Sequence, residues 1–194
     1  MDYSAVLNIT LIKKDITLLK GVSCIVNSTD QRLRMSTGLS SKIHQKAGSE
    51  LLKECQKIRY CGLGESRLTP GYQLAPYIIH TVGPYWDGGG FSERDYLYNC
   101  YKKSLLLASN NSIQSIVFPS ISTGRKKYPI DLAAEVAFRT VLSHQKSPRR
   151  LKKVIFCLND LENFMAYKKV DKMINQELKI WFTPSNLMRF GISI

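Results

Sequence analysis

Short runs of β-branched residues alternate with longer segments of helical periodicity along this chain, and that alternation constrains its fold more than any other feature. Alternation of this kind is typical of a parallel or mixed sheet with helices packed on its faces. The runs are short and mostly apolar, as expected of strands that are buried on both sides. The sequence predicts five strands, at residues 6–12, 22–26, 78–82, 115–119 and 153–158.

Apolar residues recur at helical spacing between these strands. One helix is expected from Gly38 to about Ile58, and its apolar face is formed by Leu39, Ile43, Ala47, Leu51 and Cys55. Three more helices are expected over about 97–108, 132–141 and 160–178. The predicted fold class is therefore α/β, a three-layer α/β/α domain with a central mixed sheet.

The length of 194 residues suits one domain with a tail. We expect the domain at residues 1–178 and a C-terminal tail at 179–194. A hydrophobic content of 44% excludes a largely disordered chain. The longest aliphatic run, Leu105–Ala108, is far shorter than the roughly 20 residues of a membrane span, so we expect no such span.

Five cysteines are widely spaced along the chain and form no C-x-x-C pair. They are predicted to be reduced thiols in the core, and no metal centre is expected. The N-terminus has an acid, Asp2, where a signal peptide has basic residues. We therefore expect a reducing compartment, cytoplasmic or nuclear, and a monomer that needs no cofactor.

Basic residues outnumber acidic residues, with 28 Lys and Arg against 15 Asp and Glu, and the formal net charge is +13. This surplus favours an anionic partner. Basic clusters at 149–153 and 168–169 leave open a nucleic acid or another polyanion as that partner. A run of charges is more often only a solvated face, and no stacking motif accompanies these clusters.

Two loops follow predicted strands and lead into helices, which is where open α/β sheets bind ligands. The first loop reads Asn27-Ser28-Thr29-Asp30 and then Met35-Ser36-Thr37-Gly38, and the second reads Ser120-Ile121-Ser122-Thr123-Gly124-Arg125-Lys126-Lys127. Small residues and backbone N–H groups at a helix start favour anions, and the second loop adds three cations. The loops therefore predict a ligand that carries phosphate, although neither matches the P-loop or the dinucleotide-binding fingerprint.

Several short segments together resemble the macro domain, an α/β module that binds ADP-ribose. They are Lys14-Asp15-Ile16-Thr17, Ile25-Val26-Asn27, Ile43-His44 with Ala47-Gly48, Gly71-Tyr72-Gln73-Leu74, Ile79-His80-Thr81-Val82-Gly83-Pro84, and Phe118-Pro119-Ser120-Ile121-Ser122-Thr123-Gly124 followed by Tyr128-Pro129. The likeness covers about residues 7–170 and implies the macro-domain fold. Among macro domains, the chain is similar to the mono-ADP-ribosylhydrolase-like branch. Its first loop is similar to that of ganglioside-induced differentiation-associated proteins.

The resemblance implies a set of ligand-binding residues. Asp15 matches the acid that accepts a hydrogen bond from the adenine amino group, with Ile16 packed nearby, and Asn27 matches the residue that contacts the distal ribose. A carboxylate that faces the group on C6 selects an amino purine over an oxo purine, because at that position only the amino purine presents a donor. Caps or turns remain the alternative for Asp15 and Asn27. The loop that wraps the diphosphate corresponds to Ser122, Thr123, Gly124 and Arg125.

The chain also departs from the family pattern. Asp30 stands where an Asn is expected, and only Gly38 remains of a glycine run that lets the backbone approach the diphosphate. Lys126 and Lys127 replace a Tyr-Gly pair and either bind phosphate or remain solvated. Asn159 lies where many members place an aromatic residue over adenine, a contact for which the nearby Phe164 or Tyr167 is the candidate replacement.

Catalysis is the activity that these departures put in question. Ser40 replaces the acid of hydrolytic members, and an ordinary serine is no general base near neutral pH. His44, one turn later, shares its face, and Asp30 is a further candidate acid. His80 is expected to be a core histidine.

We therefore expect a domain that binds ADP-ribose, ADP-ribosylated protein or a related adenine nucleotide, with weak or absent hydrolysis. The alternatives are a hydrolase that removes mono-ADP-ribose from Asp or Glu side chains, and a protein that binds poly(ADP-ribose), nucleic acid or another polyanion.

Overall fold

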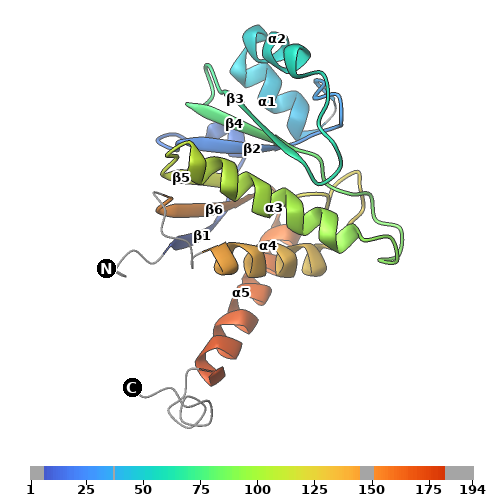
Figure 1. Ribbon diagram of the computed structural model, residues 1–194. Helices are drawn as coiled ribbons and strands as arrows, with labels where there is room; N and C mark the ends of the chain where they lie inside the picture. The colour runs from blue at the N-terminus through green and yellow to red at the C-terminus, as the bar shows by residue number, and fades with distance from the viewer. Residues whose placement is uncertain (1–6, 37, 145–150, 182–194) are drawn as a thin grey trace.

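A six-stranded mixed sheet forms the centre of the protein (Figure 1). The computed structural model describes residues 7–36, 38–144 and 151–181, with the backbone alone from 178 onward. The strands are β1 (Asn8–Lys13), β2 (Cys24–Ser28), β3 (Ser66–Pro70), β4 (Tyr77–Thr81), β5 (Ser115–Phe118) and β6 (Lys153–Leu158). Their order is β1-β6-β5-β2-β4-β3, and all neighbours are parallel except β3 and β4. The five predicted strands are confirmed with small shifts of their bounds, and Val6 lies outside the described residues.

The edge strand β3 was missing from the sequence prediction. Its sequence, Ser-Arg-Leu-Thr-Pro, offers one aliphatic side chain, so it lacks the apolar run typical of a strand. It forms because it pairs with β4 in antiparallel register, from Ser66 opposite Thr81 to Pro70 opposite Tyr77. Pro70 is tolerated because an edge strand leaves one side of its backbone without a ladder partner.

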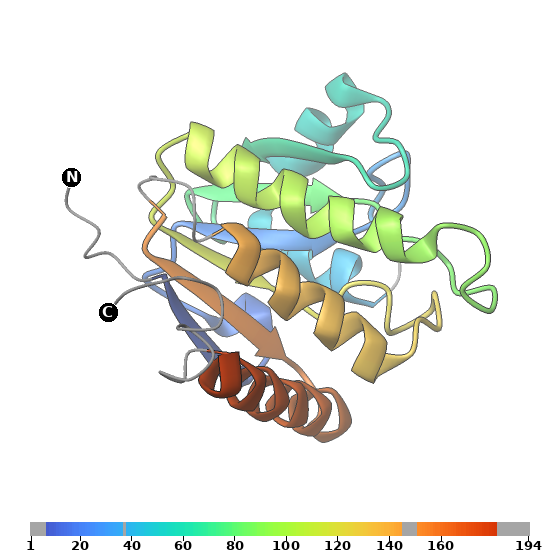
Figure 2. The same cartoon turned by 60° about the horizontal axis from the view of Figure 1, so that its bottom comes forward.

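Five α-helices cover the two faces of the sheet and complete the predicted three layers. These helices are α1 (Leu39–Ala47), α2 (Ser49–Ile58), α3 (Glu93–Asn110), α4 (Ile130–His144) and α5 (Leu161–Trp181). Figure 2 shows α3, α4 and α5 side by side across one face, while α1 and α2 pack on the other. The side chains of successive strand residues lie on opposite faces of the sheet. Ile25 and Ile78 pack against α1 and α2, whereas Val26 and Ile79 pack on the face covered by the other helices.

All five cysteines are buried free thiols, as predicted.

Helix α5 ends three residues beyond residue 178, where the domain was expected to end. Residues 182–194 of the expected tail lie outside the described residues. Within the part of the chain that the structure describes, no helix is long and apolar enough to cross a membrane.

The single helix predicted from Gly38 to Ile58 is in fact two helices that meet at Gly48. The backbone of Gly48 has φ 92° and ψ 173°, a conformation that is essentially restricted to glycine. Its N–H still donates to the carbonyl of His44 at 3.0 Å. Apolar residues before and after the break, such as Ile43 and Leu51, pack in one core, so the predicted apolar face was correct although the helix is interrupted.

Replacing Gly48 by Ala should therefore lower the free energy of unfolding by about 1–3 kcal/mol. An added Cβ would also lie 3.2 Å from Nε2 of Gln73. Gly90→Ala is the matched control, because a Cβ there meets nothing within 4 Å. Urea unfolding monitored by circular dichroism measures both variants, and equal midpoints for the two would contradict the assignment of strain to Gly48.

Candidate functional site

A cleft of about 810 Å³ lies beyond the carboxyl ends of the parallel strands, between the loops that follow β2 and β5. Ten of the predicted site residues line it: Asp15, Ile16, Asp30, Gly38, Ser122, Thr123, Gly124, Arg125, Lys126 and Asn159. The other three, Asn27, Ser40 and His44, are buried beneath its wall and do not line it. The ligand contacts proposed for all of these residues remain predictions.

Asp15 lies at one end of the cleft, where it caps a short 3₁₀ helix at Ile16–Leu18. Its Oδ1 accepts hydrogen bonds from the N–H (3.0 Å) and the hydroxyl (2.8 Å) of Thr17, so Asp15 is the cap that the sequence left open as an alternative. Its Oδ2 pairs with Nζ of Lys42 at 2.9 Å. The hydrogen bond from Lys42 is the main reason that the pKa of Asp15 falls from 3.8 to about 2. Sequence reasoning missed Lys42, since nothing in its spacing indicates a partner 27 residues away.

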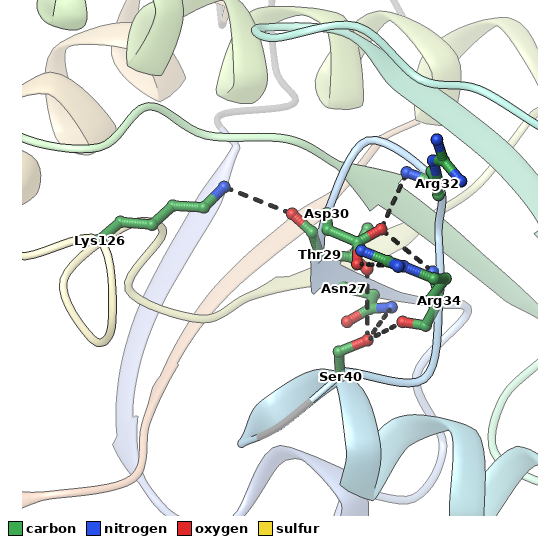
Figure 3. Close-up of polar contacts among 7 residues, drawn as sticks. All are labelled: Asn27, Thr29, Asp30, Arg32, Arg34, Ser40 and Lys126. Atoms are coloured by element: carbon green, nitrogen blue, oxygen red, sulfur yellow. Dashed lines mark hydrogen bonds and ion pairs between the residues drawn. The ribbon is translucent and has the colours of Figure 1, made fainter.

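The first loop is held together by Asp30 (Figure 3). Its Oδ1 accepts from the backbone N–H groups of Arg32 (2.8 Å) and Arg34 (3.3 Å), and its Oδ2 pairs with Nε of Arg34 at 3.0 Å. Partial burial raises the pKa of Asp30, but these hydrogen bonds outweigh burial and the net pKa is lower than usual. Leu33, fully buried between the arginines, anchors the loop in the core. The Asp30 carboxylate is thus engaged in loop structure, which leaves it poorly placed as a replacement catalytic acid.

Ser40 connects this loop to helix α1 (Figure 3). Its hydroxyl donates to the carbonyl of Arg34 at 3.2 Å and lies 3.3 Å from Oγ1 of Thr29 and 3.5 Å from Nδ2 of Asn27. With 1% of its surface exposed, Ser40 has no direct access to the cleft. The Ser40 hydroxyl therefore serves as a structural contact between the first loop and α1.

The two histidines near Ser40 differ in their surroundings. Among the residues that the structure describes, neither ring nitrogen of the buried His44 has a hydrogen-bond partner, so His44 forms no hydrogen bond with Ser40. Burial lowers the pKa of His44, against a smaller opposing effect of Asp30. His80 lies 3.2 Å from Nδ2 of Asn27 and 3.0 Å from Oγ1 of Thr69, which confirms that it is a core histidine with partners. Burial lowers its pKa to about 3, and His44 adds to the effect.

The second loop is shaped by a close approach of two backbone segments. Ser122 is buried with φ 68° and lines the cleft, and its Oγ would lie 2.1 Å from a Cβ added to Gly83. Gly83 therefore allows the loop its position. Thr123 donates to the carbonyl of Ser120 at 3.2 Å and to Oδ1 of Asn163 at 3.1 Å, which ties the loop to α5. These contacts place the loop between the segment that follows β4 and helix α5.

Lys126 and Lys127 have different environments. Nζ of Lys126 donates to the carbonyl oxygens of Gly83 (2.5 Å) and Thr29 (3.4 Å), so it joins the second loop to the first (Figure 3). Burial lowers the pKa of Lys126. Lys127 is exposed and does not line the cleft. The sequence left two alternatives for these lysines, phosphate binding or a solvated position. Lys126 lies at the cleft, as the first alternative requires, whereas Lys127 is solvated.

Neither aromatic residue expected to replace the adenine-stacking side chain lines the cleft. Tyr167 is fully buried, with its hydroxyl 3.3 Å from that of Tyr101, and Phe164 packs against the same core. That expectation was wrong, because both side chains point from α5 toward the sheet. The neighbouring Asn159 and Asp160 line the cleft instead.

The charges that line the cleft favour an anion. Five cations face three acids: Lys14, Arg34, Lys42, Arg125 and Lys126 against Asp15, Asp30 and Asp160. Among the described residues, no group of three His, Cys, Asp or Glu side chains is placed to hold a metal ion. Of the basic clusters noted in the sequence, Lys168 and Lys169 are exposed on α5, whereas Arg149 and Arg150 lie outside the described residues.

The effect of Lys42 on Asp15 can be measured directly. We expect the Asp15 carboxyl to titrate near pH 2 and to shift toward 3.8 in Lys42→Met. Because the folded-state pKa is lowered, the pair stabilises the fold above about pH 3.8 and loses this effect as the pH falls through about 2. A carbon-detected NMR titration measures the shift. An unchanged pKa in the variant would show that Lys42 does not pair with Asp15 in solution.

Comparison with known proteins gives the family. The family model described as Macro domain matches residues 26–137. A macro domain-containing protein of Chlorobaculum tepidum is 42% identical over 159 residues, which cover 81% of this chain and 92% of that protein. The human protein named ADP-ribose glycohydrolase MACROD2 is 40% identical over 164 residues, which cover 83% of this chain and 38% of the human protein.

Solved structures agree with these matches. The Oceanobacillus iheyensis macrodomain with ADP has a TM-score of 0.83 and 32% identity, and the match covers 91% of this chain and 96% of that structure. The Trypanosoma brucei macrodomain in complex with ADP-ribose has a TM-score of 0.77 and 35% identity, over 84% of this chain and 68% of that structure. The family model matches more than half of the chain, and the solved macrodomains share its fold. The chain therefore belongs to the macro domain family.

Proposed function

We propose that the cleft binds ADP-ribose, either free or attached to a protein, or a related adenine nucleotide, and that hydrolysis is weak or absent. The observation that carries this proposal is the position of Asp15 and of the second loop in one cleft of about 810 Å³. A volume of this order suits a ligand of nucleotide size. The related macrodomains solved with ADP and with ADP-ribose support the same ligand class.

The base and the diphosphate of the ligand each have a group of matching chemistry in the cleft. Asp15 is ionised at neutral pH and offers acceptor oxygens for the adenine amino group. The backbone of Ser122–Gly124, next to Lys126, offers donors and positive charge for the diphosphate. Asn27 is buried outside the lining of the cleft, and its Nδ2 contacts Oγ of Ser40 and Nδ1 of His80. Its distance from the cleft favours a positioning role over the direct ribose contact expected from sequence.

Weak hydrolysis follows from the way the first loop is folded. A general base must reach the attacking water, and Ser40 is buried with its hydroxyl donating to the Arg34 carbonyl. The remaining candidates are Asp30, which is paired with Arg34, and His44, which has no hydrogen bond to position it. A mono-ADP-ribosyl hydrolase remains the second candidate function, favoured by the similarity to the human ADP-ribose glycohydrolase.

Calorimetry with ADP-ribose tests the binding proposal. We expect a saturable signal for the wild type and a Kd about tenfold or more weaker for Asp15→Ala, because a hydrogen bond to a charged group is lost. Asp95→Ala, at an exposed position of α3 away from the cleft, is the control and should match the wild type. Absence of heat at millimolar ADP-ribose would reject the proposal.

Incubation with an automodified ADP-ribosyltransferase separates binding from hydrolysis. We expect the label to remain after long exposure to the wild type at high concentration, with human MACROD2 as the positive control. Ser40→Asp should also leave the label in place, because position 40 is buried and does not line the cleft. Release of label by the wild type would establish the second candidate function instead.

A further inference from the structure

We infer that the side chain of Arg34, on the first loop, binds a phosphate group of the ligand, and that Asp30 is a positioning residue that acts through Arg34. The inference rests on the proposed function in one respect, which is that the ligand carries phosphate. It needs no placement of the base or of a ribose within the cleft. Arg34 was not among the site residues predicted from the sequence.

The guanidinium of Arg34 is held by the protein at one nitrogen. Its Nε donates to Oδ2 of Asp30 at 3.0 Å, and among the described residues its two Nη groups have no hydrogen-bond partner. Arginine has five N–H donors, and Nε carries one of them. Arg34 lines the cleft, and its side chain is 67% exposed. The Nη donors are therefore available to a ligand in the cleft.

Asp30 fixes the direction of this guanidinium. Its Oδ1 accepts from the backbone N–H groups of Arg32 (2.8 Å) and Arg34 (3.3 Å), so the carboxylate is tied to the backbone of the same loop. The carbonyl of Arg34 accepts from the buried Ser40 at 3.2 Å, which holds the other side of the peptide unit. A side chain that is oriented before binding loses less conformational freedom when it contacts a ligand. The Asp30 pair thus prepares Arg34 for an anion.

The charges where the two loops meet favour the same anion. Nζ of Lys126 donates to the carbonyl of Thr29, next to Asp30, at 3.4 Å. Burial lowers the pKa of Lys126, and the nearby charge of Asp30 opposes this effect. Figure 3 shows the side chains of Lys126 and Arg34 both directed toward the segment Thr29–Asp30. One carboxylate therefore faces two cations, and the net charge at this place is positive.

Arg34 has the chemistry that this position requires. A guanidinium stays charged at any physiological pH, and its planar fork donates two parallel hydrogen bonds to a phosphate. Lys126 already donates to two carbonyl oxygens, those of Thr29 and Gly83. Arg34 therefore offers more free donors than Lys126 does. A phosphate that lies between the loops accepts from the Nη groups of Arg34 on one side and faces the backbone of Ser122–Gly124 on the other.

Calorimetry with ADP-ribose and with inorganic pyrophosphate tests the inference. Arg34→Gln should weaken both Kd values about tenfold or more, because charged hydrogen bonds are lost. Arg34→Lys keeps the charge but not the fork, so its Kd values should remain about threefold or more weaker than those of the wild type. Arg32→Gln is the matched control, since Arg32 is an exposed arginine of the same loop that does not line the cleft. It should match the wild type.

A double-mutant cycle tests the role of Asp30. Asp30→Asn keeps an oxygen that accepts from the two backbone N–H groups but removes the charge that orients Nε of Arg34. We expect it to weaken ADP-ribose about threefold or more in the wild type and to cause no further weakening in Arg34→Gln. An equal loss in both backgrounds would show that Asp30 does not act through Arg34.

The outcomes separate this inference from the proposed function. If the wild type binds ADP-ribose and Arg34→Gln binds it equally well, the inference fails and the proposed function stands. A wild-type Kd in Arg34→Lys would show that Arg34 acts by charge alone and would also overturn the inference. If the wild type binds pyrophosphate through Arg34 but does not bind ADP-ribose, the proposed function fails and the phosphate contact stands. If neither ligand binds, both fail. Thermal unfolding shows whether each variant is folded, and Arg34→Lys, which keeps a cation beside Asp30, carries the test if Arg34→Gln is not.

Discussion

The parallel pairing of β2 with β5 is the constraint on which the functional end of this protein depends. Parallel strands direct their carboxyl ends to one edge, so the loops after β2, β5 and β6 meet there. The chain leaves β2 toward α1 on one face of the sheet and leaves β5 toward α4 on the opposite face. Neighbouring strands whose connections diverge in this way leave a crevice between them, and the cleft lies in that crevice.

The first loop shows how polar contacts shape one wall of this crevice. Leu33 is buried in the core, and the Asp30–Arg34 pair joins the two ends of the loop segment around it. The Arg34 carbonyl accepts the hydrogen bond from Ser40, which joins the loop to the start of α1. Lys126 in turn links the second loop to the first through the carbonyl oxygen of Thr29. These are the contacts on which the proposal of weak hydrolysis rests.

The large positive charge of the chain has only a partial explanation in the cleft. Five of the 28 basic residues line it, and one of them, Lys42, is paired with the acid expected to bind the base. Lys42 illustrates that a cation that lines the cleft can have a carboxylate as its partner. Its positive charge is therefore partly neutralised within the cleft by Asp15.

The sequence by itself determined the fold class and ten of the residues that line the cleft. Buried strands and amphipathic helices carry local apolar patterns, and the segments around Asp15 and Ser122–Gly124 follow strands whose order fixes their edge of the sheet. The sequence did not indicate β3, whose polar residues become a strand only beside β4, or the break at Gly48, whose backbone angles depend on how two helices pack. Tertiary structure alone decided the Lys42–Asp15 pair and the burial of Asn27, Ser40 and His44. The reason is physical: periodicity reports which face of an element is apolar, whereas the partner of a polar side chain depends on distances between elements far apart in the chain.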